Sequence, residues 1–402
     1  MLKTNPIKLF IAMFAWSLYF PSIAIFNIGN NTGIQTSLPL GIAITIILFS
    51  YNTTVSRRFL QWYGALLLLI IYQISYFFIY EIHDAIYFKN LTHIMTSFFM
   101  ILLGYLISSY SLNDFTKYYM IGGVFSSIFG ITQYLCWNVL RFDIQLLRGM
   151  HNNNSFTNLG SIDNIIEFGR SFGFAPEPSI YALLLIPALL IAFQKRYWIY
   201  GAIIMTAMFT CMSLTSILFI PVYIVYSIRG NKLLLSSIII MSLILSGWYI
   251  NYVLSSISFD SISGDSDLIF RILDLKNNAS FISRSNSILS TSEIIISNPL
   301  LGVGYTEWLN NHISNNAIDA IESNTGINSL AMLIATIFGM PFFLLLIAPV
   351  IKSFSINNEN TAILISLFMI IPSLFVLSYY SFYLPWVGLG ICSHLVINSQ
   401  KR

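Results

Sequence analysis

Apolar stretches of close to 20 residues recur along the whole chain and are separated by polar segments. A helix of about 20 apolar residues crosses the hydrocarbon core of a bilayer. The pattern therefore predicts an all-α, polytopic integral membrane protein with about twelve transmembrane helices, because helices satisfy their own backbone groups in lipid. The expected spans are 7–26, 36–52, 61–80, 91–110, 118–140, 178–194, 197–212, 214–228, 233–254, 326–350, 360–378 and 380–397.

Two segments are too polar to lie in the membrane, and they divide the single membrane domain. Residues 1–140 carry the first five expected spans, 178–254 the next four and 326–402 the last three. The polar segments between them, 141–177 and 255–325, are rich in Asn, Ser, Asp and Gly. Loops of this length between helices are usually functional or form small domains, so we expect the chemistry there.

Composition agrees with a membrane protein and argues against a nucleic-acid partner. Apolar residues make up 56% of the 402 residues and charged residues only 9%, against about 25% in soluble domains. No basic cluster exceeds two adjacent residues, which argues against a nucleic-acid partner. Cys136, Cys211 and Cys392 all lie in apolar segments, where we expect small core residues rather than a disulfide framework.

The distribution of charge predicts the orientation. A cytoplasmic N-terminus places 12 of the 19 basic residues inside, with only Asp114 and Glu359 among the acids, as the positive-inside rule requires. Both long loops are then outside and both termini inside. This arrangement needs two crossings within 197–228, where about 16 residues reach only about 24 Å of a core of about 30 Å. Either the bilayer thins there, or the polar turn at 213–215 lies below the outer surface.

The first candidate site lies where the first long loop re-enters the membrane. Pro176 and Pro178 bracket Glu177, so a stiff backbone sets the direction of its carboxylate. An ionisable group at the membrane boundary is costly unless it is paired or functional. Glu177 is therefore a candidate catalytic residue, with Arg170 as its partner or as an anion ligand. The alternative is that Glu177 caps the N-terminus of a helix.

The second candidate site lies in the second long loop. Arg284 lies on a helix predicted over 283–297, which Pro299 ends, and Gly302 and Gly304 follow in a turn that brings backbone N–H groups close to a ligand. The planar guanidinium of arginine binds phosphate oxygens in pairs. Arg170, Arg284 and Arg271 are thus candidates to hold a pyrophosphate. The alternative is that these arginines pair with acidic residues of the outer loops.

Two further residues of that loop are weaker candidates. His312 is the one histidine nominated as a general base, and Trp308 is a candidate for stacking on a sugar. The alternative for Trp308 is the aromatic belt at the membrane interface. No histidines have metal-ligand spacing, so a zinc site has no support, and no cofactor is expected.

At these two sites the chain resembles the Wzy-type O-antigen polymerase and O-antigen ligase superfamily. The first family pattern, at the step into a membrane helix, reads here Arg170, Gly173, Glu177, Pro178, Ser179 and Ala182. The later pattern reads Arg284 followed by Asn298, Pro299, Leu300, Leu301, Gly302, Val303 and Gly304. The many spans with two large outer loops also match. Ligases carry a His-Asn step before the next span, and here Ile327-Asn328-Ser329 lacks the histidine, which favours a polymerase.

The resemblance implies a metal-independent glycosyltransferase of the bacterial cytoplasmic (inner) membrane. Such a polymerase joins oligosaccharide repeat units carried on undecaprenyl pyrophosphate, for O-antigen, capsule or exopolysaccharide. Arg170 and Arg284 would neutralise the pyrophosphate, and Glu177 would act on the acceptor hydroxyl. The expected partners are the lipid-linked oligosaccharides and membrane lipid, and a chain-length regulator protein is a further candidate partner. The alternatives are an O-antigen ligase or a transporter or flippase of lipid-linked sugars, although no internal repeat supports a carrier.

Overall fold

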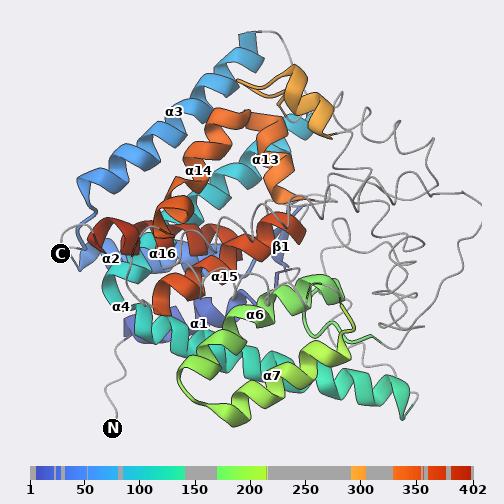
Figure 1. The fold of residues 1–402 in the computed structure, drawn as a ribbon. Coiled ribbons are helices and arrows are strands. Elements are labelled where there is room, and N and C mark those ends of the chain that lie inside the picture. Colours follow the sequence, from blue (N-terminus) through green and yellow to red (C-terminus); the bar gives the residue numbers. More distant parts are fainter. Residues whose placement is uncertain are drawn as a thin grey trace, which may run out of the picture.

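A computed structural model describes residues 6–21, 24–28, 32–51, 53–79, 85–140, 170–213, 215, 291–304, 329–354, 356, 361–376 and 382–399. Helices make up almost all of this part of the chain, with one short antiparallel β-hairpin (Figure 1). The predicted all-α class is therefore confirmed, apart from the hairpin. Most of both predicted outer loops and the expected spans 214–228 and 233–254 lie outside the described residues.

The first helices are interrupted by the hairpin. Helix α1 (Pro6–Ser17) is followed by β1 (Ala24–Ile28), β2 (Thr32–Gln35), α2 (Ser37–Ser50) and α3 (Arg57–Ile79). In the hairpin Phe26 is opposite Ile34 and Asn27 is opposite Gly33. The span predicted over 7–26 therefore ends early. Pro21 accounts for this, because proline has no N–H and disfavours helical backbone in the residue before it.

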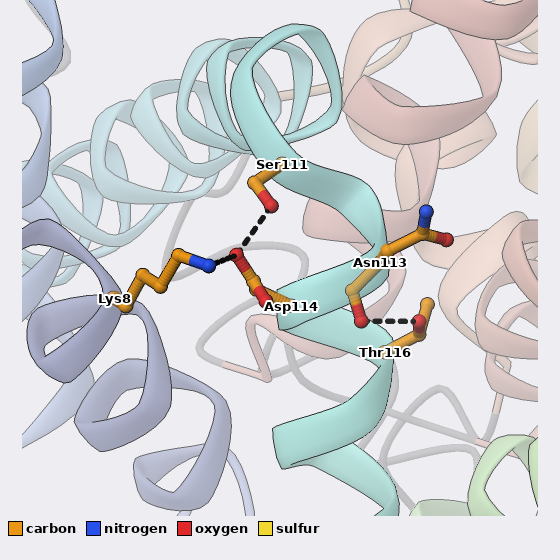
Figure 2. A network of polar contacts seen from close by, with 5 residues as sticks. All are labelled: Lys8, Ser111, Asn113, Asp114 and Thr116. Atoms are coloured by element: carbon orange, nitrogen blue, oxygen red, sulfur yellow. Dashed lines mark hydrogen bonds and ion pairs between the residues drawn. The ribbon is translucent and has the colours of Figure 1, made fainter. Parts of the chain in front are cut away.

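Helix α4 (Ala85–Asn138) is two helices joined at a corner. Ser111 leaves the helical conformation, with φ −159° and ψ 74°. The arms on either side run in different directions (Figure 1). In Figure 2 the Ser111 hydroxyl donates to Oδ2 of Asp114 at 2.6 Å, and Lys8 Nζ of α1 lies 3.2 Å from the same oxygen. The two arms match the separate spans predicted over 91–110 and 118–140.

Helices α6 (Pro178–Gln194) and α7 (Trp198–Thr210) form an antiparallel pair that packs on the second arm of α4. Every residue from 180 to 192 is buried, as expected of a helix that is apolar all round. Helix α7 ends close to the predicted residue 212, and the polar residues Ser213 and Thr215 after it are 4% and 2% exposed. Both side chains are buried within the protein, and the depth of this turn in the membrane stays a prediction.

The last helices are α13 (Leu330–Phe338), α14 (Met340–Ser353), α15 (Thr361–Val376) and α16 (Leu384–Ser399). The span predicted over 326–350 is broken into α13 and α14 at Gly339, which has φ +81°. Pro341 follows in the first turn of α14, where its missing N–H costs nothing. Helix α16 packs most extensively against α4 and α15, and these helices form the centre of the fold.

One described helical stretch, Thr92–Asn138, is long and apolar enough to cross a membrane. Its most apolar window has a mean hydropathy of 1.5 and is 61% buried within the protein. A buried helix of a soluble protein passes the same test, and seven shorter apolar helices of the described part have 10–17 residues each. The number of twelve spans therefore stays a prediction.

Candidate functional site

The segment from Arg170 begins against the C-terminal end of α7. The backbone N–H of Ser171 donates to the carbonyl of Thr210 at 3.1 Å, and their two hydroxyl oxygens lie 2.8 Å apart. Arg170 is half-buried and donates its Nε to the carbonyl of Cys211 at 3.3 Å. The last carbonyls of a helix have no partner within it and carry partial negative charge. The guanidinium is thus placed where a cation is stabilised.

Two buried phenylalanines hold the next residues on the second arm of α4. The ring of Phe174 stacks on Phe129 with centroids 4.2 Å apart and an angle of 8° between the planes. The ring of Phe172 lies 5.4 Å from Trp137, nearer the end of the same arm. Because both phenylalanines are buried, this part of the first long loop belongs to the core.

Gly173 lies between these rings at the tightest point of the segment. Its φ of +56° favours glycine, and a Cβ there would lie 2.5 Å from the ring of Tyr181. The hydroxyl of Tyr181 donates to the carbonyl of Ser126 at 2.8 Å. Glycine at position 173 is therefore explained by close packing between the segment, α6 and α4.

Glu177 occupies the N-cap position of α6, with extended backbone at φ −142° and ψ 152°. Its carboxylate makes no hydrogen bond to the helix backbone, and Pro178 at the first helical position offers no N–H. One carboxylate oxygen, Oε2, accepts instead from the hydroxyl of Ser179 at 3.2 Å. Glu177 is half-buried, whereas Pro176 and Pro178 are buried. The carboxylate thus lies at the positive end of the α6 dipole without acting as a hydrogen-bonded cap.

The turn at Gly302 and Gly304 lies against the break between α13 and α14. Both glycines have positive φ, +65° and +68°. The N–H of Val303 donates to Thr336 at 2.8 Å, and the N–H of Gly304 donates to Ile337 at 3.1 Å. These acceptors are carbonyls at the C-terminal end of α13. The backbone N–H groups of Val303 and Gly304 therefore already donate to carbonyls within the protein, so they are not available to a ligand. A ligand-binding role for Gly302 and Gly304 stays a prediction.

Gln73 of α3 completes this turn. Its side-chain amide is 5% exposed and donates to the carbonyl of Leu301 at 3.0 Å and also to the carbonyl of Ile337. A Cβ on Gly302 would lie 2.5 Å from the carbonyl carbon of Ile337, so the turn and the helix break fit only with glycine. One buried amide thus joins the loop turn to the end of α13.

Gln133 of α4 anchors the segment from Arg170 to Glu177 in a similar way. Oε1 of Gln133 accepts from the N–H of Gly173 at 2.9 Å and of Phe172 at 3.3 Å, and its Nε2 donates to the carbonyl of Gly173 at 3.3 Å. Sequence reasoning missed both Gln73 and Gln133. The signal was present, since an amide in an apolar span needs hydrogen-bond partners.

The structure describes only part of the predicted site. Arg170, Glu177, Gly302 and Gly304 are described, whereas Arg271, Arg284, Trp308 and His312 lie outside the described residues. The end of the helix predicted over 283–297 is helical at 291–297 and stops before Pro299, as expected. Figure 1 shows the two described segments apart, one at the start of α6 and the other beside α13.

Among the described residues, no group of His, Cys, Asp and Glu side chains is arranged to hold a metal ion. Comparisons with known proteins assign no family: no protein-family model, no curated protein and no solved structure matches this chain.

Proposed function

We propose that this chain is a polysaccharide polymerase of the bacterial cytoplasmic membrane, with undecaprenyl-pyrophosphate-linked oligosaccharide repeat units as donor and acceptor. The observation that carries the proposal is the segment from Arg170 to Glu177. It brings a half-buried guanidinium and a half-buried carboxylate into one segment that buried neighbours hold in place. These are the residues that carry the resemblance to the Wzy-type superfamily.

The proposal includes about twelve membrane spans, both termini in the cytoplasm and both long loops outside. Large apolar side chains on the outer faces of several helices support a lipid environment, since Leu68 is 67% exposed, Ile46 66% and Phe209 67%. The ion pair between Lys8 and Asp114 supports one part of this topology, because it places the start of α1 and the corner of α4 on the same side, as the proposal requires.

The chemistry follows from the charges. The acceptor hydroxyl oxygen forms a bond to the anomeric carbon of the donor sugar, and the bond from that carbon to the pyrophosphate oxygen breaks. The hydroxyl proton passes to the Glu177 carboxylate, and the lipid pyrophosphate leaves with the electron pair. Arg170 and Arg284 neutralise the charge that grows on the leaving group. Because this is a single displacement, the configuration at the anomeric carbon of the donor sugar is inverted.

A carrier of lipid-linked sugars is the second candidate, because one observation favours it. Discontinuous membrane helices are typical of transporter substrate sites, and α13 and α14 are separated by a break at Gly339. A carrier would move the repeat units across the membrane without joining them.

The test is complementation of a deletion strain, with the polysaccharide analysed by gel electrophoresis. Arg170→Ala, Arg284→Ala and Glu177→Ala at normal expression should each leave single repeat units, whereas the control Arg57→Ala should restore long chains. Arg57 is an exposed residue at the start of α3, on the proposed cytoplasmic side. Long chains from Arg170→Ala and Arg284→Ala would refute the assignment. A deletion strain with no attached units at all would point to a ligase or a flippase.

A further inference from the structure

Gln133 is a buried amide in the second arm of α4, with 3% of its surface exposed. Its oxygen faces two backbone N–H groups, of Phe172 and Gly173, and its nitrogen faces the carbonyl of Gly173. This set of partners determines the orientation of the amide, because the reverse orientation would place its NH₂ group against two donors. Three hydrogen bonds from one side chain thus hold two consecutive residues of the segment.

The segment is held from its other side as well. Tyr181 packs against the position where Gly173 lacks a side chain, and its hydroxyl returns to the arm that carries Gln133. Gly173 therefore has an amide on one side and an aromatic ring on the other. The backbone between Arg170 and Glu177 has little freedom to shift while both contacts are present.

We propose that Gln133 is a positioning residue, which sets the placement of Arg170 relative to Glu177 for transfer from the lipid pyrophosphate. The inference rests on the proposed function, and Gln133 itself touches no substrate. Groups that act on a transition state lose much of their effect when they are displaced by an ångström. Gln133 holds the backbone midway between the two charged residues.

The replacement that removes all three hydrogen bonds at nearly constant volume is Gln133→Met. The matched control is Thr132→Val, on the same arm, since the exposed hydroxyl of Thr132 donates to the carbonyl of Ile128 within its own helix, at 2.9 Å. Gln133→Glu keeps the side-chain length and an acceptor oxygen for the two N–H groups, and burial favours its neutral form, whose O–H can donate to the carbonyl of Gly173. It is the conservative variant that should rescue activity.

The assay uses purified full-length protein in proteoliposomes, with lipid-linked repeat units extracted from the deletion strain as the probe. Gln133→Met should lower the apparent kcat by about 10- to 100-fold with KM changed by less than about 3-fold, because the carboxylate and guanidinium are misplaced rather than removed. Gln133→Glu should retain most of the wild-type rate, and Thr132→Val all of it. A purely structural role would lower the amount of folded protein and leave the kcat of the folded fraction unchanged.

A Gln133→Met protein with wild-type kcat would overturn the inference while Arg170→Ala remained inactive. If Arg170→Ala and Glu177→Ala also polymerised normally, the proposed function would fail instead. Should Gln133→Met not accumulate in the membrane, Gln133→Asn is measured, because its shorter amide cannot reach both N–H groups. Full activity of Gln133→Asn, or failure of both variants to fold, would reduce Gln133 to a folding residue and overturn the proposal.

Discussion

The contact between α4 and α16 offers a sharp test of the fold. A Cβ on Gly390 would collide with the carbonyl oxygen of Ile101 and would lie 2.7 Å from the backbone nitrogen of Tyr105 and 2.9 Å from Cα of Gly104. Small residues at a contact let two packed helices approach this closely. Gly390→Ala should therefore force the two helices apart.

The magnitude follows from these distances. Ordinary contact begins at 3.4 Å, so the alanine methyl is too close to the Tyr105 nitrogen by about 0.7 Å, and the obstacles are backbone atoms that cannot rotate away. Overpacking of this kind costs about 3 kcal/mol at the upper end of its usual range. The better helix propensity of alanine returns about 1 kcal/mol, which leaves a loss of about 2 kcal/mol in the free energy of unfolding.

The assay is thermal unfolding in detergent, followed with a thiol-reactive dye. Cys211 and Cys392 are buried thiols that form no disulfide, so their labelling reports unfolding, and the partly exposed Cys136 sets the baseline. The control is Gly64→Ala in α3, where a Cβ would meet nothing within 4 Å. The control should leave the melting temperature unchanged or raise it. The reasoning fails if Gly390→Ala melts no lower than Gly64→Ala.

Two further predictions concern buried and charged polar groups. Gln73→Met leaves the carbonyls of Leu301 and Ile337 without this donor and should destabilise the protein by about 1–3 kcal/mol in the same assay; a loss below about 0.5 kcal/mol would contradict it. At the α4 corner the Ser111 hydroxyl, together with Lys8, lowers the pKa of Asp114 from 3.8. The ionised carboxylate thus stabilises the fold at pH values above 3.8, the pKa of an ordinary Asp, and this stabilisation is lost as the pH falls through the lowered pKa of Asp114. In unfolding measurements from pH 6 to 3, Asp114→Asn should lose less stability on acidification than the wild type. If both proteins show the same dependence of stability on pH, the role of the Asp114 carboxylate is refuted.

Several features of the fold could be predicted because their causes are local. Proline on either side of Glu177 and at residue 299 gave helix boundaries, since a missing N–H and a restricted φ act on adjacent residues. The separate spans predicted over 91–110 and 118–140 left a gap in which the corner of α4 lies, at Ser111. The early end of α1 and the hairpin after it were missed, because an apolar run does not distinguish a helix from a short strand.

The candidate site divides in the same way. The sequence alone determined which residues carry charge next to the apolar runs, where glycine permits a positive φ and which runs are apolar. Only the tertiary structure decided the acceptors of the amides in the glycine turn, the break of the predicted span at Gly339 and the anchoring of each segment by Gln73 or Gln133. The physical reason is distance along the chain. Backbone conformation depends on adjacent residues, whereas a buried amide is satisfied by whatever group packing brings to it.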